Sequence, residues 1–375
     1  MKIHSVFDSG NIRCLSAEEA SDIHLEISKD KDSDFYQWFH FRLTGARDSE
    51  CRMIIENAEG AAYPKGWPNY RACASYDRET WFRVPTEYQG GKLIIQHTPE
   101  FDSVYYAYFA PYSMERHADM VADAAQSDFV DLRVLGETLD GRTMDCLSLV
   151  SEGENRRTIW VIARQHPGES MAEWAAEGLI ERLLDESDPV GRALREQADI
   201  HVVPNMNPDG SFRGHLRTNA VGSNLNREWA EPSLDKSPEV FHVLNAMQKT
   251  GCDLFLDMHG DEAIPYNFIA GAEGAPGFSD KDDALLQAYK AVLVTASPDF
   301  QTKYGYPRNA PGKANMTIAG NAMFGYFGCL AMTLEMPFKD NDDLPDPDSG
   351  WSPERSRHLG AACLDAMLQV IDQLR

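Results

Sequence analysis

Apolar runs alternate with helix-like stretches along the second two-thirds of the chain, and this alternation limits the possible folds more than any other feature. The apolar runs are 157–163, 200–203 and 253–258, and the stretches with helical spacing are 171–184 and 238–249. Strands that alternate with helices form βαβ units, whose strands run parallel and are covered on both faces. The pattern predicts an α/β region with a mixed, largely parallel sheet flanked by helices.

The individual segments fit this prediction. Residues 158–163 (TIWVIA) are almost all apolar, as expected of a strand that is buried on both faces. In 171–184, apolar and small residues recur at spacings of three and four, which gives the helix one face to lay on the sheet. An acidic stretch with prolines at 339–350 predicts a surface loop before a last helix at 354–374.

Up to Tyr112 the chain has a different residue pattern. Short β-type runs are separated by turn signals, at 33–43, 51–56, 80–84 and 92–97. This pattern predicts an all-β sandwich. We therefore expect two domains, a β-sandwich at 1–114 and the α/β domain at 115–375. The aromatic run 35–41 needs cover on more than one side, so the sandwich is expected to pack against the second domain and to shape the rim of a cleft.

Charge and cysteine content exclude several classes of protein. The 375 residues carry 35 Lys and Arg against 59 Asp and Glu, a formal net charge of -24. Binding to nucleic acid needs a basic face, so no nucleic-acid partner is expected. No apolar run approaches the ~18 residues of a membrane span, and the N-terminus lacks a secretory pattern, so no membrane partner is expected. The seven cysteines form no CxxC pair, which predicts reduced thiols in a cytoplasmic protein.

Two predicted strand ends carry residues that can bind a metal. The sequence RQHPGE at 164–169 follows one strand and contains His166 and Glu169, and DMHG at 257–260 closes another and contains His259. In open α/β sheets, ligands gather at the carboxyl ends of strands. Two imidazoles with one carboxylate are a usual ligand set of catalytic zinc. We expect these three residues to bind one Zn²⁺ per chain, which would polarise a carbonyl and lower the pKa of water.

A third strand end holds an acid within an apolar run, LAMTLEMP at 330–337. Burying an unpaired carboxylate is costly, so Glu335 is expected to be paired or functional. Beside a metal it can take a proton from water and pass it to a leaving amine. Taken singly, the other residues also have plainer interpretations: His166 as a surface residue at a turn, Glu169 as an acid favoured by the helix dipole, and His259 as a strand cap.

The segment 203–229 has neither helical nor strand periodicity. It contains Asn-Pro-Asp-Gly at 207–210, which is a turn by its chemistry, and then Arg217, Asn226 and Arg227. The planar fork of arginine matches a carboxylate in a bidentate fashion. In a chain this acidic, the three residues predict a carboxylate-binding cluster.

Five motifs now stand in a fixed order: HPGE, NPDG, NLNREW, DMHG and TLE before a proline. Together they resemble the zinc carboxypeptidase family over residues from about 115 to 375. The sequence YYAYFAPYS at 105–113 and the β-rich region before it resemble, more narrowly, the cytosolic carboxypeptidases, a subgroup that includes tubulin-deglutamylating enzymes.

The resemblance implies a role for each candidate residue. His166, Glu169 and His259 would be the zinc ligands, and Glu335 the general base and acid. Arg217 would polarise the scissile carbonyl and stabilise the oxyanion. Asn226 and Arg227 would hold the terminal carboxylate of the substrate.

The chain departs from the family pattern in two places. The acid that usually orients a zinc histidine is Asn224 here, whose oxygen can accept the imidazole N–H without adding charge, so lower metal affinity is expected. The loop tyrosine of the family has no clear counterpart, because counting back from Glu335 leads to Lys313. The neighbouring tyrosines are Tyr304, Tyr306 and Tyr326.

Three functions remain open. A metallocarboxypeptidase would act on the C-terminus of a peptide or protein and would need the Asn226–Arg227 clamp together with Arg217. A zinc-dependent deacylase of N-acyl amino acids, in the same fold, would share the metal motif and also need an arginine. A binding module with a vestigial site would have lost a ligand or the base, whereas all four residues are present here.

Substrate preference depends on the segment 304–313, which places Arg308 and Lys313 in a Gly/Pro-rich loop upstream of Glu335. The resemblance implies that the side-chain pocket lies there and that the deglutamylating subgroup carries basic residues in it. A preference for acidic C-terminal residues, glutamate above all, is therefore expected. The plainer interpretation is that both cations are solvated loop charges.

Overall fold

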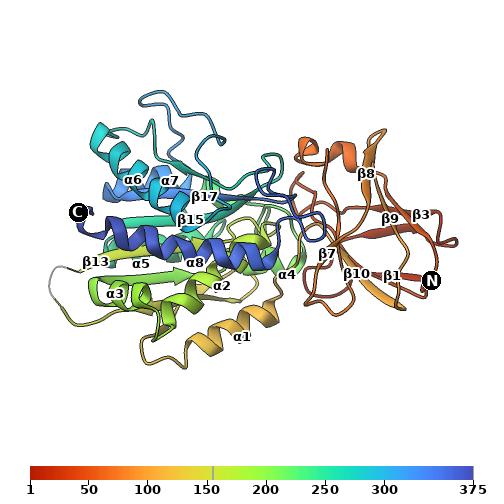
Figure 1. The fold of residues 1–375 in the computed structure, drawn as a ribbon, viewed down its shortest axis with the longest axis horizontal. Helices are drawn as coiled ribbons and strands as arrows, with labels where there is room; N and C mark the ends of the chain where they lie inside the picture. The colour runs from red at the N-terminus through yellow and green to blue at the C-terminus, as the bar shows by residue number, and fades with distance from the viewer. Residues whose placement is uncertain (154–155, 375) are drawn as a thin grey trace.

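The computed structural model describes residues 1–153 and 156–374. A β-rich N-terminal region and an α/β region lie side by side, with the two chain ends at opposite ends of the molecule (Figure 1). This arrangement confirms the predicted fold class. The division at residue 114 stays a prediction, and α1 (Met114–Ala124) begins there with Ser113 as its N-cap.

The N-terminal region is a sandwich of two five-stranded sheets. Most neighbouring strands in them are antiparallel, and β3 and β5 are a parallel pair. One sheet has the order β1 (Lys2–His4), β4 (His40–Thr44), β10 (Ser103–Ala107), β6 (Cys73–Ser75), β7 (Phe82–Arg83). The other has the order β2 (Arg13–Ser16), β3 (Ile23–Glu26), β5 (Cys51–Ile55), β9 (Lys92–His97), β8 (Thr86–Gln89). Two 3₁₀ turns, η1 (Ala58–Gly60) and η2 (Pro64–Gly66), follow β5.

The predicted strand at 33–43 is wrong over residues 33–39, since β4 covers only His40–Thr44. Residues before it bury their aromatic rings in a loop that side chains hold in place. The amide of Gln37 bonds both backbone groups of Tyr63, at 2.8 and 3.1 Å, and Trp38 Nε1 donates to Ser9 O at 2.8 Å. Aromatic residues are frequent in strands, but here tertiary packing satisfies the backbone without a sheet.

The α/β region is built on a seven-stranded sheet. Its order is β11 (Asp131–Glu137), β12 (Thr143–Leu149), β14 (Ala198–Val203), β13 (Arg157–Ala163), β15 (Leu254–Asp261), β17 (Leu330–Pro337), β16 (Phe268–Gly271). The four central strands β14, β13, β15 and β17 are parallel, and β11, β12 and β16 add antiparallel edges. The sheet is therefore mixed and largely parallel, as predicted.

Helices cover both faces of this sheet. Along β13, Ile159 and Val161 face a core that includes α2, α6 and α8, whereas Trp160 and Ile162 face a core that includes α5 and α7. The alternation follows from the two-residue period of a strand. The helices are α2 (Ser170–Leu184), α3 (Pro189–Gln197), α4 (Pro208–Arg213), α5 (Pro238–Thr250), α6 (Asp280–Ala296), α7 (Ala319–Phe327) and α8 (Pro353–Val370), with η3 (Leu225–Arg227) and η4 (Ile371–Gln373).

The α/β elements expected from the sequence are present, with two informative shifts. The strand predicted at 253–258 continues to Asp261, so His259 lies inside β15 and not after it. The predicted turn Asn-Pro-Asp-Gly is the start of α4. Asn207 caps this helix by accepting from Gly210 N, and Pro208 takes the first helical position, where a missing N–H costs nothing.

The sandwich packs against the α/β region, as the aromatic run predicts. The rings of Tyr108 and Phe338 stack with centroids 4.5 Å apart. The guanidinium of Arg83 donates to the backbone carbonyls of Phe338, Lys339 and Trp351. Buried backbone carbonyls need hydrogen-bond donors, so Arg83 stabilises the contact between the two regions.

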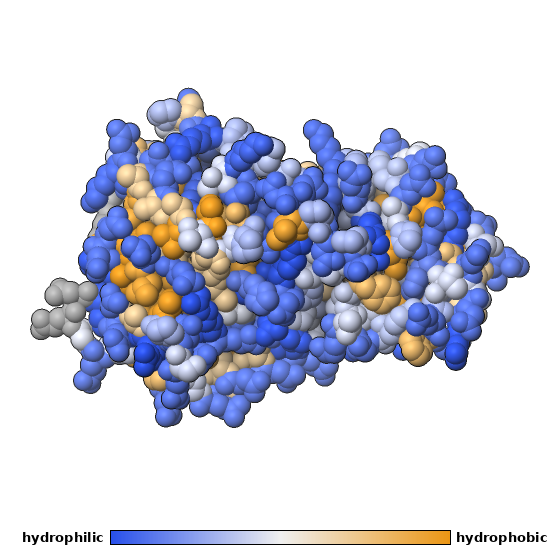
Figure 2. Space-filling view, viewed as in Figure 1, coloured by the Kyte–Doolittle hydropathy of each residue, from blue (hydrophilic) through white to orange (hydrophobic). Residues whose placement is uncertain are grey.

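The face of the molecule shown in Figure 2 is mostly hydrophilic, in keeping with the charge of the chain. Within the described residues, the helices are all too short or too polar to cross a membrane. All seven cysteines lie in the described part of the chain and are free thiols.

Candidate active site

The parallel strands bring the predicted residues to one edge of the sheet. The register of β15 and β17 pairs His259 with Glu335, and β13 pairs Ala163 with Met258, so the loop with His166 and Glu169 leaves the sheet beside His259. Side chains far apart in the sequence meet because neighbouring parallel strands end together.

Arg164 fixes the loop that carries His166 and Glu169. Its backbone has φ of 58°, a left-handed conformation that is uncommon for a residue other than glycine. The buried guanidinium compensates by donating to Pro167 O at 2.9 Å, Tyr112 O at 2.8 Å and Glu173 Oε2 at 2.7 Å. Backbone strain of this kind persists only where the surroundings hold it, and it is frequent at functional sites.

The three candidate ligands converge on one point. His166 Nδ1 lies 2.7 Å from Glu169 Oε1 and 3.2 Å from His259 Nδ1, and His259 Nδ1 lies 2.7 Å from Glu169 Oε2. Tetrahedral zinc, with bonds of about 2.0–2.2 Å, places neighbouring ligand atoms roughly 3.3 Å apart. All three side chains are buried, and burial together with the charge of Arg217 lowers the pKa of His166 to about 3, so its imidazole is neutral. The donor set therefore fits Zn²⁺.

Further polar groups orient these ligands. Asp257 Oδ2 lies 2.9 Å from His259 Nε2 and accepts from Gln165 Nε2 at 2.6 Å. Asn224 Oδ1 lies 3.1 Å from His166 Nε2, and Gly260 N donates to Glu169 Oε2 at 3.1 Å. Burial disfavours the charged form of His259, but the carboxylates of Asp257 and Glu169 outweigh it and raise its pKa. A carboxylate or amide oxygen behind each histidine fixes which ring nitrogen faces the metal.

Glu335 lies at the mouth of this ligand set. Its side chain is buried, and Oε2 has no hydrogen-bond partner among the residues that the structure describes. Burial, followed by the negative charges of Glu169, Asp261 and Asp257, raises its pKa well above the ordinary value. A carboxyl group at this position can accept a proton from water and return it.

Tyr306 is a residue to which the sequence assigned no role. Its hydroxyl donates to Asp261 Oδ2 at 2.7 Å and lies 3.2 Å from Glu335 Oε1. The ring packs edge-on against Phe268 on β16, while the side chain remains about half exposed at the cavity mouth. Counting from motifs could not select it among the nearby tyrosines, because the loop that carries it has no regular structure.

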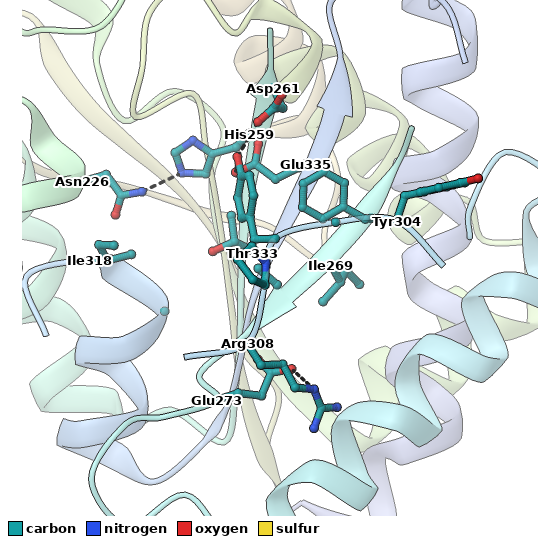
Figure 3. A pocket seen from close by; sticks show the side chains of 18 of the residues that line it. Asn226, His259, Asp261, Ile269, Glu273, Tyr304, Arg308, Ile318, Thr333 and Glu335 are labelled. Carbon is teal, nitrogen blue, oxygen red and sulfur yellow. Dashed lines mark hydrogen bonds and ion pairs between the residues drawn. The ribbon is translucent and has the colours of Figure 1, made fainter. Parts of the chain in front are cut away.

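Two arginines face the metal ligands without a compensating charge. Among the described residues, the guanidinium groups of Arg217 and Arg227 have no carboxylate within 4.0 Å. Burial and the charge of Arg217 lower the pKa of Arg227. Asn226 precedes Arg227, and its Nδ2 lies 3.4 Å from His259 Nε2 (Figure 3). Its Oδ1 accepts from Ala319 N at 2.8 Å. Two adjacent cations in a chain of net charge -24 form a site for an anion.

One cavity of about 490 Å³ is lined by the three candidate ligands together with Arg217, Asn226, Arg227, Tyr306 and Glu335. In Figure 3, His259 and Glu335 lie at one end of it, and Glu273 and Arg308 at the other. Arg308 is mostly exposed, and its guanidinium pairs with Asp283 at 2.9 Å and with Glu273 at 3.6 Å. Its charge is thus compensated by carboxylates of the protein.

Lys313 is exposed and is not among the residues that line the cavity, so the structure does not bring it to the other candidates. Lys290 on α6 does line the cavity, and sequence reasoning missed it. Asp283, Gln287 and Lys290 recur at the spacing of one helix face, but only the packing of α6 shows that this face borders the cavity.

Two family models match the chain. The one described as cytosolic carboxypeptidase N-terminal domain matches residues 3–109, and the one described as zinc carboxypeptidase matches residues 115–357.

Individual proteins give the same picture. An uncharacterized protein of Zymomonas mobilis is 53% identical over 374 residues, covering 100% of this chain and 97% of that protein. Human cytosolic carboxypeptidase 1 is 29% identical over 321 residues, which are 72% of this chain but only 26% of the human protein. A metallo-carboxypeptidase from Pseudomonas aeruginosa, solved in complex with (2-guanidinoethylmercapto)succinic acid, is 47% identical, covers 100% of both chains and has a TM-score of 0.98.

Proposed function

This chain belongs to the zinc carboxypeptidase family, and from that premise we propose that it removes the C-terminal residue of peptides or proteins. The matches confirm the family resemblance predicted from the five motifs, and the protein is a metallocarboxypeptidase of the hydrolase class. Because the chain spans about a quarter of human cytosolic carboxypeptidase 1, the substrates of that larger protein are not transferred to it.

One observation carries the proposal. The His166–Glu169–His259 set and Glu335 share a cavity with two arginines that have no carboxylate partner among the described residues. A metal site with a buried carboxyl supports hydrolysis of many bonds. The two arginines additionally require an anion close to the bond that is hydrolysed. The terminal carboxylate of a peptide supplies such an anion.

His166, Glu169 and His259 would hold Zn²⁺, which when bound polarises the scissile carbonyl and lowers the pKa of water. Asn226 and Arg227 would bind the terminal carboxylate of the substrate and set the position of the last peptide bond. Arg217 would donate to the carbonyl oxygen as negative charge develops on it.

Glu335 would transfer the proton. Its carboxylate takes a proton from the attacking water, whose oxygen bonds to the carbonyl carbon. The same carboxyl then gives that proton to the amide nitrogen as the C–N bond breaks, and the amine leaves. The raised pKa of Glu335 suits this return of the proton, and the hydroxyl of Tyr306 is placed to orient the carboxyl.

The preference for acidic C-terminal residues is the finer part of the proposal. Lys290 supports it: burial lowers its pKa, and no carboxylate lies within ion-pairing distance of it among the described residues. A glutamate side chain that reaches the far end of the cavity would meet Lys290 and displace none of the existing ion pairs. Arg308 would contribute only a charge already shared with Glu273 and Asp283.

The cytoplasmic location likewise stays a prediction. It is supported by the match to the cytosolic carboxypeptidase N-terminal domain.

Product analysis tests the proposed function. The zinc-loaded protein is incubated with peptides that differ only in their last residue (Glu, Lys or Leu) and with an N-acetyl amino acid, and the products are identified by mass. We expect release of a single C-terminal residue, fastest for Glu. Cleavage of the N-acetyl amino acid alone would identify a deacylase, and no cleavage of any substrate by zinc-loaded protein would identify a binding module.

A further inference from the structure

The segment that carries Arg217 is held by the N-terminal sandwich. Residues 214–224 contain no helix or strand, so no ladder fixes them. Asp30, in the loop after β3 and only 2% exposed, accepts from the amides of Leu216 at 2.7 Å, Arg217 at 2.8 Å and Thr218 at 2.9 Å, and from Thr218 Oγ1 at 3.1 Å. Four donors occupy the acceptor capacity of one carboxylate.

The chain just before this contact is tied to the sandwich as well. Ser9 N donates to Phe212 O, Asn11 Nδ2 donates to Gly214 O at 2.9 Å, and Lys31 N donates to His215 Nε2 at 3.2 Å. The backbone around Arg217 therefore depends on a partner region about 190 residues earlier in the chain.

The guanidinium of Arg217 lies between two rings of the sandwich. Its central carbon is 5.5 Å from the ring centroid of Phe35 and 5.4 Å from that of Tyr63, within the range of cation–π attraction. Within the described part of the chain, its side chain makes no hydrogen bond, and Tyr63 lines the catalytic cavity.

Rings and carboxylates would hold an arginine with different consequences. A carboxylate partner would fix the guanidinium but neutralise it and occupy its donors. Aromatic faces attract the cation while leaving its planar N–H groups free. For a residue that must stabilise a developing oxyanion, the second arrangement keeps both charge and donors available.

We propose that Asp30, Phe35 and Tyr63 of the N-terminal sandwich are positioning residues for Arg217, so that the active site is assembled from both regions of the chain. This inference rests on the proposed function, in which Arg217 stabilises the oxyanion. It assigns the sandwich a part in catalysis beyond packing and beyond shaping the rim of the cavity.

A double-mutant cycle separates positioning from mere stabilisation. In the zinc-loaded full chain, Asp30→Asn is expected to lower kcat/KM for a C-terminal Glu peptide by about ten- to a hundredfold, mainly through kcat. In the Arg217→Met background the same change should alter kcat/KM by less than about twofold, because the group it positions is already gone. Equal losses in both backgrounds would overturn the proposal.

This comparison needs two controls, the zinc content of each variant and a matched variant. Leu216 O accepts from Gly168 N at 2.9 Å, so the segment also touches the metal loop, and zinc must be measured in every variant. Arg83→Met removes a buried contact between the same two regions at a different place. It should lower the melting temperature without changing kcat/KM, and a loss of kcat/KM equal to that of Asp30→Asn would contradict a specific role for Asp30.

Tyr63 gives a second test, because its side chain is only partly buried and borders the cavity. Tyr63→Leu removes the ring and is expected to lower kcat/KM roughly two- to thirtyfold, the range of one cation–π contact. Tyr63→Phe keeps the ring and should retain the activity. If Phe is as poor as Leu, the hydroxyl and not the ring is what matters, and this part of the proposal fails.

Hydrogen exchange makes the structural claim independent of activity. Asp30→Asn should speed exchange of the amides of Leu216, Arg217 and Thr218, read by mass spectrometry, whereas Arg83→Met should leave them slow. Unchanged exchange in Asp30→Asn would show that Asp30 does not fix residues 216–218. If wild-type protein cleaves no peptide, the proposed function fails, and the exchange result still decides whether Asp30 fixes this segment.

Discussion

The two ends of the catalytic cavity are built in different ways. At the metal end, His259 and Glu335 sit on adjacent parallel strands, and the His166–Glu169 loop leaves a third strand beside them. At the far end, Lys290 and Arg308 come from α6 and from a loop without regular structure, and Arg308 is mostly exposed. The side chains at the metal end are buried, and neighbouring strands of the sheet fix their positions. The far end is formed by a helix and a loop that meet only through tertiary packing.

This difference suggests that the metal end carries out the reaction and that the far end selects the substrate. Groups that must be held within a fraction of an ångström are placed on the rigid sheet. Charges that choose among substrates stand on a helix face and a loop, where one substitution can change them without disturbing the sheet. Variants at the metal end should therefore abolish the reaction, and variants at the far end should change its preference.

Removing a ligand at the metal end should have the largest effect. His166→Ala is expected to reduce bound zinc from about one ion per chain to near zero and to abolish peptide hydrolysis, because a catalytic site needs its three protein ligands. Zinc is measured by atomic absorption. The control is His201→Gln, which changes a buried histidine that stacks on Trp160 away from the site and should retain zinc. Full zinc content in His166→Ala would remove His166 from the ligand set.

The next effect should come from Glu335→Gln, which keeps shape but loses the proton carrier. We expect kcat to fall by about 10²–10⁴, the usual contribution of a general acid–base group, with zinc content unchanged. Steady-state kinetics and zinc analysis on the same preparation check this. If zinc is lost along with activity, Glu335 is a ligand or a structural residue, and the chemistry belongs to another group.

The carboxylate clamp should show an intermediate effect. Arg227→Met keeps much of the side-chain volume but removes charge-assisted hydrogen bonds of about 1.5–3 kcal/mol, so kcat/KM should fall roughly ten- to a hundredfold. The loss should appear mostly as a higher KM, since the terminal carboxylate is bound in ground and transition states alike. An unchanged KM would place the carboxylate elsewhere.

The smallest effect is expected at the far end. Lys290→Met should reduce the preference for Glu over Leu by about tenfold, because a bound carboxylate would lose its partner. Arg308→Met is the matched variant and should change the ratio less, since Arg308 is already paired with Asp283 and Glu273. The ratio of kcat/KM values for two otherwise identical peptides decides between them. A larger effect of Arg308→Met would reverse the assignment.

The same contrast explains what could be predicted from the sequence. Residues at the metal end follow from strand periodicity and from the motifs, and Asp257 could have been added because it precedes His259 by two on the same strand face. The far end could not be predicted: the loop 304–313 offered Lys313, which is exposed, whereas Lys290 reaches the cavity only through the packing of α6.

The contact between Asp30 and residues 216–218 is harder still to predict. Its two sides are almost 190 residues apart, and neither side carries a motif that points to the other. A single aspartate in a loop is ordinarily a turn residue. Its four acceptor contacts exist only once the sandwich has docked on the α/β region.

The central claim is that two free arginines beside a zinc site select a substrate by its terminal carboxylate. The most direct measurement compares two peptides of identical sequence, one ending in a free carboxylate and one in an amide, incubated with the zinc-loaded protein. We predict that only the last residue is released from the acid and that the amide reacts at least about a hundredfold more slowly. Equal rates for the two peptides, or cleavage at an internal bond, would contradict the account.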